Sequence, residues 1–123
     1  MTHIARITIA VDHIEPMVAF YNAVFGCGLE PFEMAGFTLY EGTLAGIPLV
    51  FTPNASLGIE AKQNRQQFDI AVPDADAAIE AALAHGGTLL RQSGVIGAGG
   101  SRMVSLADPD GNTVVIVETY NTQ

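Results

Sequence analysis

The sequence has no tryptophan and a single cysteine, Cys27, among its 123 residues. A lone cysteine excludes a disulfide within the chain, so we expect the reducing environment of the cytoplasm. No apolar run approaches the roughly 20 residues that a membrane-spanning helix requires. The start of the chain also lacks the apolar stretch of a signal peptide. These absences predict a soluble, cytoplasmic protein with no membrane partner.

Basic residues are scarce as well. Five Lys and Arg stand against 13 Asp and Glu, which gives a formal net charge of −8. Nucleic acid and anionic membranes repel such a chain, so neither is an expected partner. Charged residues make up only 15% of the chain, and the mean hydropathy is +0.31. This balance leaves apolar surface for a second copy to cover, and we therefore expect a homodimer.

The chain repeats itself once. Residues 6–11 (RITIAV) and 67–72 (QFDIAV) share the string Ile-Ala-Val at an offset of 61 residues. Both segments alternate polar and apolar residues and are rich in β-branched side chains, which predicts strands buried on one face. A helical pattern follows each strand, and glycines at 26 and 87, again 61 residues apart, mark the two helix ends. The repeat predicts a duplicated strand–helix unit.

Three strand-like runs separated by turn residues follow each predicted helix. They cover residues 29–34, 37–44 and 47–52 in the first half, and 88–92, 102–106 and 113–118 in the second. Each half is therefore predicted to be a βαβββ module, in an α+β fold. We expect a single domain over residues 1–123, with modules at 1–53 and 66–123 joined by a crossover at 54–66.

Two connections in the second half have a distinctive composition. Asp108-Pro-Asp-Gly-Asn112 has proline at its second and glycine at its fourth position, which predicts a tight turn before the last strand, with a structural role. Gly94 to Gly100 is rich in glycine but lacks the lysine and the helix that follow in a phosphate-binding loop. We expect a mobile loop there.

Several of these features together resemble the vicinal oxygen chelate superfamily. They are the two βαβββ modules, Phe20-Tyr21 and the ending Val-Phe-Gly26 in the first helix, and Asp-Pro-Asp-Gly-Asn before the last strand. That superfamily includes glyoxalase I, extradiol dioxygenases, fosfomycin-modifying enzymes, methylmalonyl-CoA epimerase and bleomycin-binding resistance proteins. The resemblance covers nearly the whole chain and implies a curved mixed sheet around a cleft. It does not specify an activity, because one scaffold hosts many chemistries.

The resemblance also locates the metal-binding positions of the metal-dependent members. Those members typically hold a divalent ion with two histidines and two carboxylates, one from the first and one from the last strand of each half. Counted from Phe20-Tyr21, from the repeat and from the final turn, the positions fall on Arg6, Val50, Gln67 and Val115. Guanidinium and valine have no lone pair to donate, and a glutamine carbonyl is a weak neutral ligand. We therefore expect no metal and no cofactor there.

Polar side chains take the place of those ligands. Because side chains alternate along a strand, Arg6 and Thr8 share one face, and Gln67 and Asp69 share the equivalent face of the second half. The resemblance implies that the two faces meet around the cleft. Arginine suits a carboxylate or phosphate, and Asp69 can accept from a hydroxyl or an amine. We expect an organic, possibly acidic ligand there; alternatively, Arg6 and Asp69 pair with each other and fill the cleft.

Other residues complete or stay outside this predicted site. Val50 and Val115 would lie beside the polar group, and the strands that would wall the cleft carry Phe32, Met34, Phe37, Tyr40 and Met103. Of these five we include Tyr40 and Met103 in the ligand site. The three histidines, His3, His13 and His85, share no strand face or metal spacing, and we expect them to be solvated. Cys27 has no histidine partner at a suitable spacing and is expected to be a packed thiol.

Three functions follow from these residues. The first is a metal-free small-molecule-binding protein, similar to the drug-sequestering resistance members. The second is a divalent-metal lyase, isomerase or dioxygenase whose ligands are non-standard, such as Asp69, Glu41 or Glu118. The third is metal-free acid–base catalysis by Asp69, with Arg6 stabilising an anion. The sequence favours the first and leaves open whether any reaction is catalysed.

Overall fold

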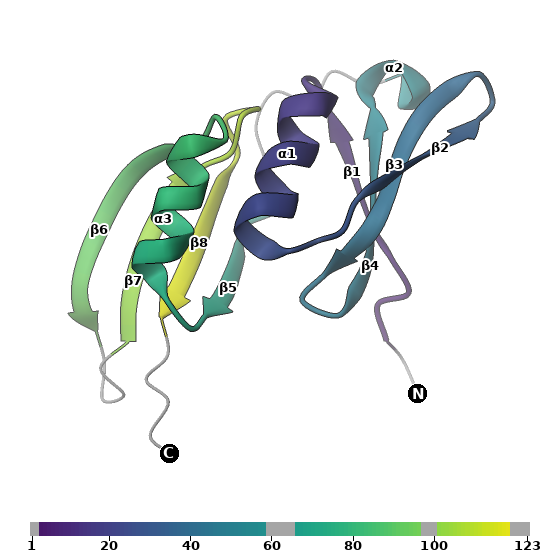
Figure 1. Cartoon of the computed structure of the whole chain (residues 1–123). Helices are drawn as coiled ribbons and strands as arrows, with labels where there is room; N and C mark the ends of the chain where they lie inside the picture. The colour runs from purple at the N-terminus through teal and green to yellow at the C-terminus, as the bar shows by residue number, and fades with distance from the viewer. Residues whose placement is uncertain (1–2, 59–65, 97–100, 119–123) are drawn as a thin grey trace.

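A computed structural model describes residues 3–58, 66–96 and 101–118 of the chain. Figure 1 shows two modules side by side, each with one long helix. The first contains β1 (Ile7–Val11), α1 (Ile14–Phe25), β2 (Glu30–Met34), β3 (Phe37–Leu44), β4 (Ile47–Pro53) and the short α2 (Asn54–Leu57). The second contains β5 (Phe68–Val72), α3 (Ala75–Ala84), β6 (Thr88–Ile96), β7 (Ser101–Ala107) and β8 (Thr113–Glu118).

Hydrogen bonds join the strands into two sheets of four rather than one continuous sheet. The strand orders are β1-β4-β3-β2 and β5-β8-β7-β6, so the two modules have the same topology. In each sheet the first and last strands of the module pair in parallel, and the other pairs are antiparallel. The predicted α+β fold of two tandem βαβββ modules is confirmed.

Sequence and structure differ at two connections. The crossover predicted at 54–66 begins with helix α2, and β6 continues to Ile96, so the start of the predicted glycine-rich loop belongs to a strand. Residues 97–100 of that loop lie outside the described part of the chain. No helix in the described part is long and apolar enough to cross a membrane.

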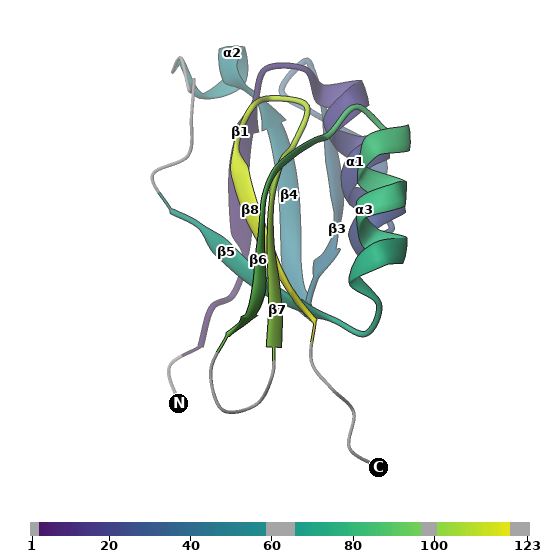
Figure 2. The same cartoon turned by 90° about the vertical axis from the view of Figure 1, so that its left-hand side faces the viewer.

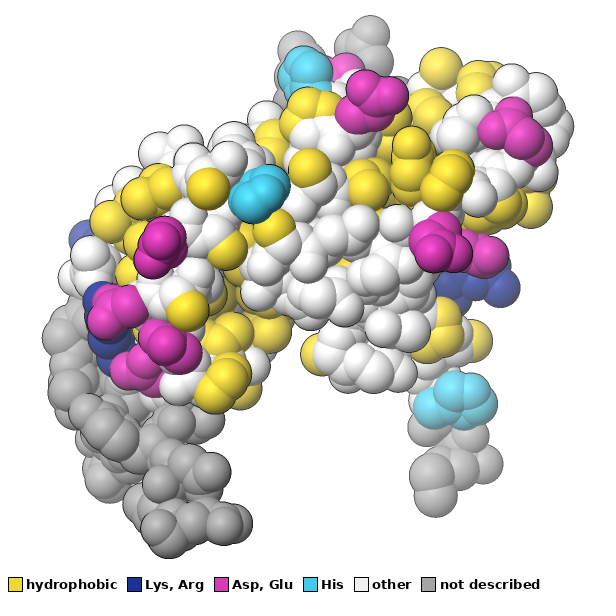
Figure 3. All heavy atoms as spheres, in the orientation of Figure 1, with side chains coloured by type: hydrophobic (Ala, Val, Ile, Leu, Met, Phe, Trp, Pro, Cys, Tyr) yellow, Lys and Arg dark blue, Asp and Glu magenta, His cyan; other side chains and the backbone are white. Residues whose placement is uncertain are grey.

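Both long helices lie on the same side of the sheets, as Figures 1 and 2 show, and they contact each other. The core lies between helices and sheets and draws on both modules, with Phe20 of α1, Phe51 of β4 and Ile116 of β8 fully buried. Burying a side chain of this size contributes about 1.5–3 kcal/mol. The two long helices do not cover the opposite faces of the sheets. Acidic side chains lie at separate places on the helix-bearing side (Figure 3).

The glycines at the two helix ends have different roles in spite of their equivalent positions. Gly26 takes a left-handed conformation, with φ of 61°, and its N–H donates to the Asn22 carbonyl at 3.1 Å, which ends α1. After α3 the left-handed residue is Gly86, with φ of 84°. Gly87 is instead a point of close approach, because a Cβ there would collide with the Phe20 ring of the other module. The second glycine is thus needed for packing between the modules.

The turn between β7 and β8 also joins the modules. The buried Asp108 carboxylate accepts the hydroxyl of Tyr21 in α1 at 2.9 Å. It also accepts the backbone N–H groups of Asp110 and Asn112 and the amide of Asn112, which closes the turn. Burial raises the pKa of Asp108, and these hydrogen bonds oppose that rise. The same carboxylate therefore orders the turn and holds α1.

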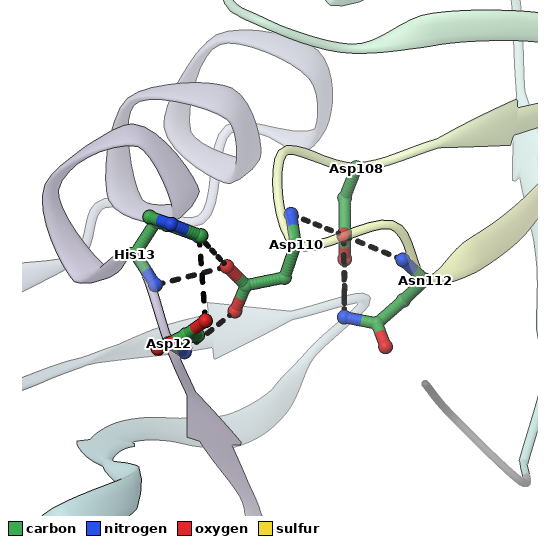
Figure 4. Close-up of polar contacts among 5 residues, drawn as sticks. All are labelled: Asp12, His13, Asp108, Asp110 and Asn112. Carbon is green, nitrogen blue, oxygen red and sulfur yellow. Dashed lines mark hydrogen bonds and ion pairs between the residues drawn. The ribbon is translucent and has the colours of Figure 1, made fainter. Parts of the chain in front are cut away.

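Asp110 of this turn lies at the start of α1 (Figure 4). Its carboxylate accepts the backbone N–H of Asp12 at 2.8 Å and of His13 at 2.9 Å, and it lies 2.9 Å from His13 Nδ1. In the second module Asp74 caps α3 locally by accepting the N–H of Ala77 at 3.1 Å. The turn predicted before the last strand thus also binds the N-terminus of a helix in the other module.

His13 is exposed, as expected for a solvated histidine, but it is paired. The hydrogen bond to Asp110 raises its pKa, and the charges of Asp12 and Asp110 add to that rise. Because the ordinary pKa of histidine lies near neutral pH, this pair gives the junction between the modules a pH dependence.

The Tyr21–Asp108 hydrogen bond is expected to stabilise the fold. Tyr21→Phe removes a buried donor to a carboxylate and should lower the free energy of unfolding by about 1–3 kcal/mol. Tyr40→Phe is the matched control, because the Tyr40 hydroxyl has no partner among the described residues. Urea unfolding followed by circular dichroism measures both variants. Equal midpoints for the two variants would show that the hydrogen bond adds no stability.

The ion pair of His13 is expected to appear in an NMR titration. In the native protein the pKa of His13 should lie above its ordinary value of 6.5, and Asp110→Asn should lower it. Because the folded-state pKa is the higher one, this stabilisation is complete below the unfolded pKa and is lost as the pH rises through the folded pKa. The His85 resonance in the same spectra is the control. A His13 titration that Asp110→Asn does not change would contradict the pairing.

Candidate functional site

A pocket of about 440 Å³ lies on the face of the first sheet that α1 does not cover. Alternation along the strands creates it: Ile7, Ile9 and Val11 of β1 pack toward the core, so Thr8 between them points to the other face. In β4, buried Phe51 alternates in the same way with pocket-lining Val50. Because one face of each strand packs into the core, the residues that alternate with the core residues lie on the pocket face.

The polar part of the pocket includes two groups of opposite charge. Strand register sets Thr8 of β1 beside Val50 of β4, and Val50 beside Glu41 of β3. Arg6 precedes Thr8 on the same face of the chain, just before β1 begins. Arg6 and Glu41 therefore lie on opposite sides of Val50, and both side chains are exposed.

The apolar part of the pocket is formed by the β2–β3 hairpin. Phe32 lies opposite Leu39, and Met34 lies opposite Phe37, so four apolar side chains form two cross-strand pairs on the pocket face. Met34 is 57% exposed, which is high for a side chain of its size and hydrophobicity. Ala35, in the hairpin turn, completes this wall. An apolar surface beside charged groups is suited to an amphipathic ligand.

Hydroxyl groups line the end of the pocket beside α2. Thr52, at the end of β4, is buried, and its hydroxyl contacts that of Ser56 in α2. The Ser56 hydroxyl also donates to the Pro53 carbonyl at 2.9 Å. The short helix that the sequence did not predict therefore supplies a side chain of the pocket and fixes its position.

The structure divides the residues that the sequence assigned to one site. Arg6, Thr8 and Val50 line the pocket. Asp69, Met103 and Val115 belong to the second sheet, Gln67 directly precedes its strand β5, and none of these four is part of the lining. Tyr40 lies opposite Phe51 and packs against the core, on the other face of β3. The pocket is formed by one module.

The alternative in which Arg6 and Asp69 neutralise each other has no counterpart in the described residues. Asp69 instead accepts the side-chain amide of Gln67 at 2.9 Å. The ion pairs of the described residues join His13 to Asp12 and Asp110, and Arg102 to Asp76. The Arg6 guanidinium thus has no ionic partner in the described part of the chain.

Sequence reasoning missed Glu41, Thr52 and Ser56 as pocket residues. The signal for Glu41 was present in the predicted strands 37–44 and 47–52. A two-residue turn at Ala45-Gly46 pairs Leu44 with Ile47 and therefore Glu41 with Val50. Ser56 had no such signal, because a four-residue helix has too short a pattern to be distinguished from a loop.

The side chains at the four positions predicted from the resemblance do not fit a divalent metal ion. These positions, Arg6, Val50, Gln67 and Val115, carry a guanidinium, an amide and two valine side chains. In the described residues, no three His, Cys, Asp or Glu are grouped to hold an ion. The possible substitutes are separate: Glu41 lies in the first sheet and Asp69 in the second, and the Glu118 carboxylate accepts the N–H of Ala75 at 2.7 Å.

Solved structures with this fold come from several organisms. A glyoxalase/bleomycin resistance protein/dioxygenase family enzyme from Burkholderia phytofirmans PsJN is 18% identical, with 97% of this chain and 100% of that chain covered and a TM-score of 0.73. A glyoxalase-related enzyme from Fulvimarina pelagi is 21% identical, with 97% and 89% covered and a TM-score of 0.72. The fosfomycin resistance protein FosX from Listeria monocytogenes is 16% identical, with 98% and 95% covered and a TM-score of 0.73. At these identities the likeness is one of fold.

The family assignment comes from the sequence itself. No curated protein matches it significantly. The profile of a family described as a glyoxalase-like domain matches residues 6–117, nearly the whole chain. The chain therefore belongs to the glyoxalase-like domain family, and the resemblance to the vicinal oxygen chelate superfamily is confirmed.

Proposed function

We propose that this protein binds a small organic ligand with an acidic group in the pocket of the first sheet, without a metal ion. The proposal rests on one observation: Arg6 lines the pocket, and its guanidinium has no ionic partner among the described residues. A guanidinium binds a carboxylate or a phosphate through two parallel hydrogen bonds. Thr8, on the same face, adds a hydroxyl.

The size and the wall of the pocket support a ligand rather than an isolated anion. Its volume of about 440 Å³ lies within the range of small-molecule sites, roughly 300–1,000 Å³. The apolar side chains Phe32, Met34, Phe37 and Leu39 would cover the apolar part of a bound molecule. Burial of this part would supply most of the affinity, and Arg6 would fix its orientation.

We infer a homodimer as the state in which the protein works. Among the residues whose burial is described, the large apolar side chains that are more than half exposed are Ile4, Met34, Leu83 and Leu90. Such exposure favours association of two copies, although single apolar side chains at a surface are common. Because Met34 also lines the pocket, a second copy at this position would enclose the ligand further.

The role of Arg6 is tested with 3-phenylpropionate, a carboxylate with an aromatic ring. Chemical-shift changes in the amide spectrum should show binding to the first sheet, and Arg6→Ala should weaken it at least tenfold, about 1.4 kcal/mol. Arg91→Ala is the matched control, since Arg91 belongs to the other sheet. Equal affinities of the Arg6→Ala variant and the parent protein would remove Arg6 from the site.

Binding without metal is tested by calorimetric titration. Protein treated with a chelator is titrated with nickel, zinc, manganese and iron(II), and we expect no tight, stoichiometric binding of any of them. The physical reason is the donor set at the four family positions. One tightly bound ion per chain would contradict the proposal and would favour the metal-dependent lyase, isomerase or dioxygenase function.

A further inference from the structure

We propose that the ligand also carries a protonated amine and that Glu41 binds it, so that the pocket takes zwitterionic, amino-acid-like molecules with an apolar side chain. The inference rests on the proposed function and names the ligand class of the same pocket. It follows from the placement of Glu41 and Arg6, from the carboxylate beside Glu41, and from the position of the apolar wall.

Glu41 and Arg6 are opposite charges that share a pocket without neutralising each other. Neither side chain forms a hydrogen bond or an ion pair with another described residue. Val50 of β4 lies between them. It pairs with Glu41 of β3 on one side and with Thr8 of β1 on the other. Thr8 follows Arg6 on the same face of the chain. Neighbouring strands are about 4.8 Å apart, so Glu41 and Thr8 are separated by about 10 Å. A molecule above Val50 can contact both charged groups.

A second carboxylate makes the Glu41 side of the pocket unfavourable for an anion alone. Glu30 of β2 lies directly opposite Glu41, and like charges in such a pair repel each other. A cation at Glu41 would relieve this repulsion, whereas a simple acid held by Arg6 would be repelled by both carboxylates. The net charge of −8 acts in the same direction, because it attracts cationic groups to the protein.

The apolar wall continues from Glu41 along the same face of β3. Leu39 is the next residue on that face, and Phe32 lies beside it in β2. Phe37 follows two residues further along the strand. A ligand with its amine at Glu41 and its acidic group toward Arg6 would therefore extend an apolar side chain over the β2–β3 hairpin. An aromatic or long aliphatic amino acid has this arrangement of groups.

The test compares three probes that share a phenyl ring: L-phenylalanine, 3-phenylpropionate and 2-phenylethylamine. They differ only in which charged groups they carry, so each affinity reports one part of the pocket. Binding is measured by chemical-shift titration of the parent protein, of Glu41→Gln and of Glu33→Gln. Glu33 is the matched control, because it lies on the other face of β2 and accepts the hydroxyl of Thr38 at 2.6 Å.

We expect the parent protein to bind L-phenylalanine at least tenfold more tightly than either probe with a single charge. Glu41→Gln should remove this advantage and should leave the affinity for 3-phenylpropionate unchanged or higher, while Glu33→Gln should change neither. If 3-phenylpropionate binds as tightly as L-phenylalanine, or Glu41→Gln leaves the affinity for L-phenylalanine unchanged, the inference is wrong and the proposed function stands. If no probe binds, both are wrong.

Discussion

The buried carboxylate of Asp108 is the interaction on which the arrangement of the two modules depends. It orders the β7–β8 turn through backbone and side-chain donors, and it accepts the Tyr21 hydroxyl of the other module. A buried carboxylate is costly unless several donors satisfy it, which explains why the turn and the helix meet at this residue. The contact of Phe20 with Gly87 and the contact of α1 with α3 lie at the same junction. The helix-facing core is therefore shared by both modules.

The two sheets have the same topology but differ in the chemistry of their uncovered faces. In the first, Arg6, Thr8, Val50 and Glu41 share a face with an apolar hairpin, and a pocket results. In the second, the equivalent positions Gln67 and Asp69 bond to each other. The helix-facing positions of β1 and β5 are apolar in both modules, because packing in the core restricts them. On the other face, Arg6 and Thr8 of the first module have polar counterparts of different charge in the second.

The sequence was sufficient for the fold and for part of the site. Period-two alternation and the 61-residue offset located the modules, because the burial of one face of each strand imposes that pattern. Arg6, Thr8 and Val50 were placed correctly on one face for the same reason. Tyr40 was assigned to the cleft by its strand, although it lies opposite Phe51 and packs against the core. The grouping of both sheets' residues into one site came from the resemblance and stays a prediction, because the described pocket is lined by residues of the first module.

The start of α1 has a consequence for the two halves as separate pieces. Its first amides are accepted by Asp110, which lies almost a hundred residues away in the sequence, whereas α3 uses Asp74 directly before it. If the first half were cut from the chain, the N–H groups at the start of α1 would lose their acceptor, Asp110. The Phe20 ring would also lose its contact with Gly87. The halves have the same topology but are not interchangeable. A circular permutant opened at the crossover would keep every one of these contacts, whereas a homodimer of first halves would lose them.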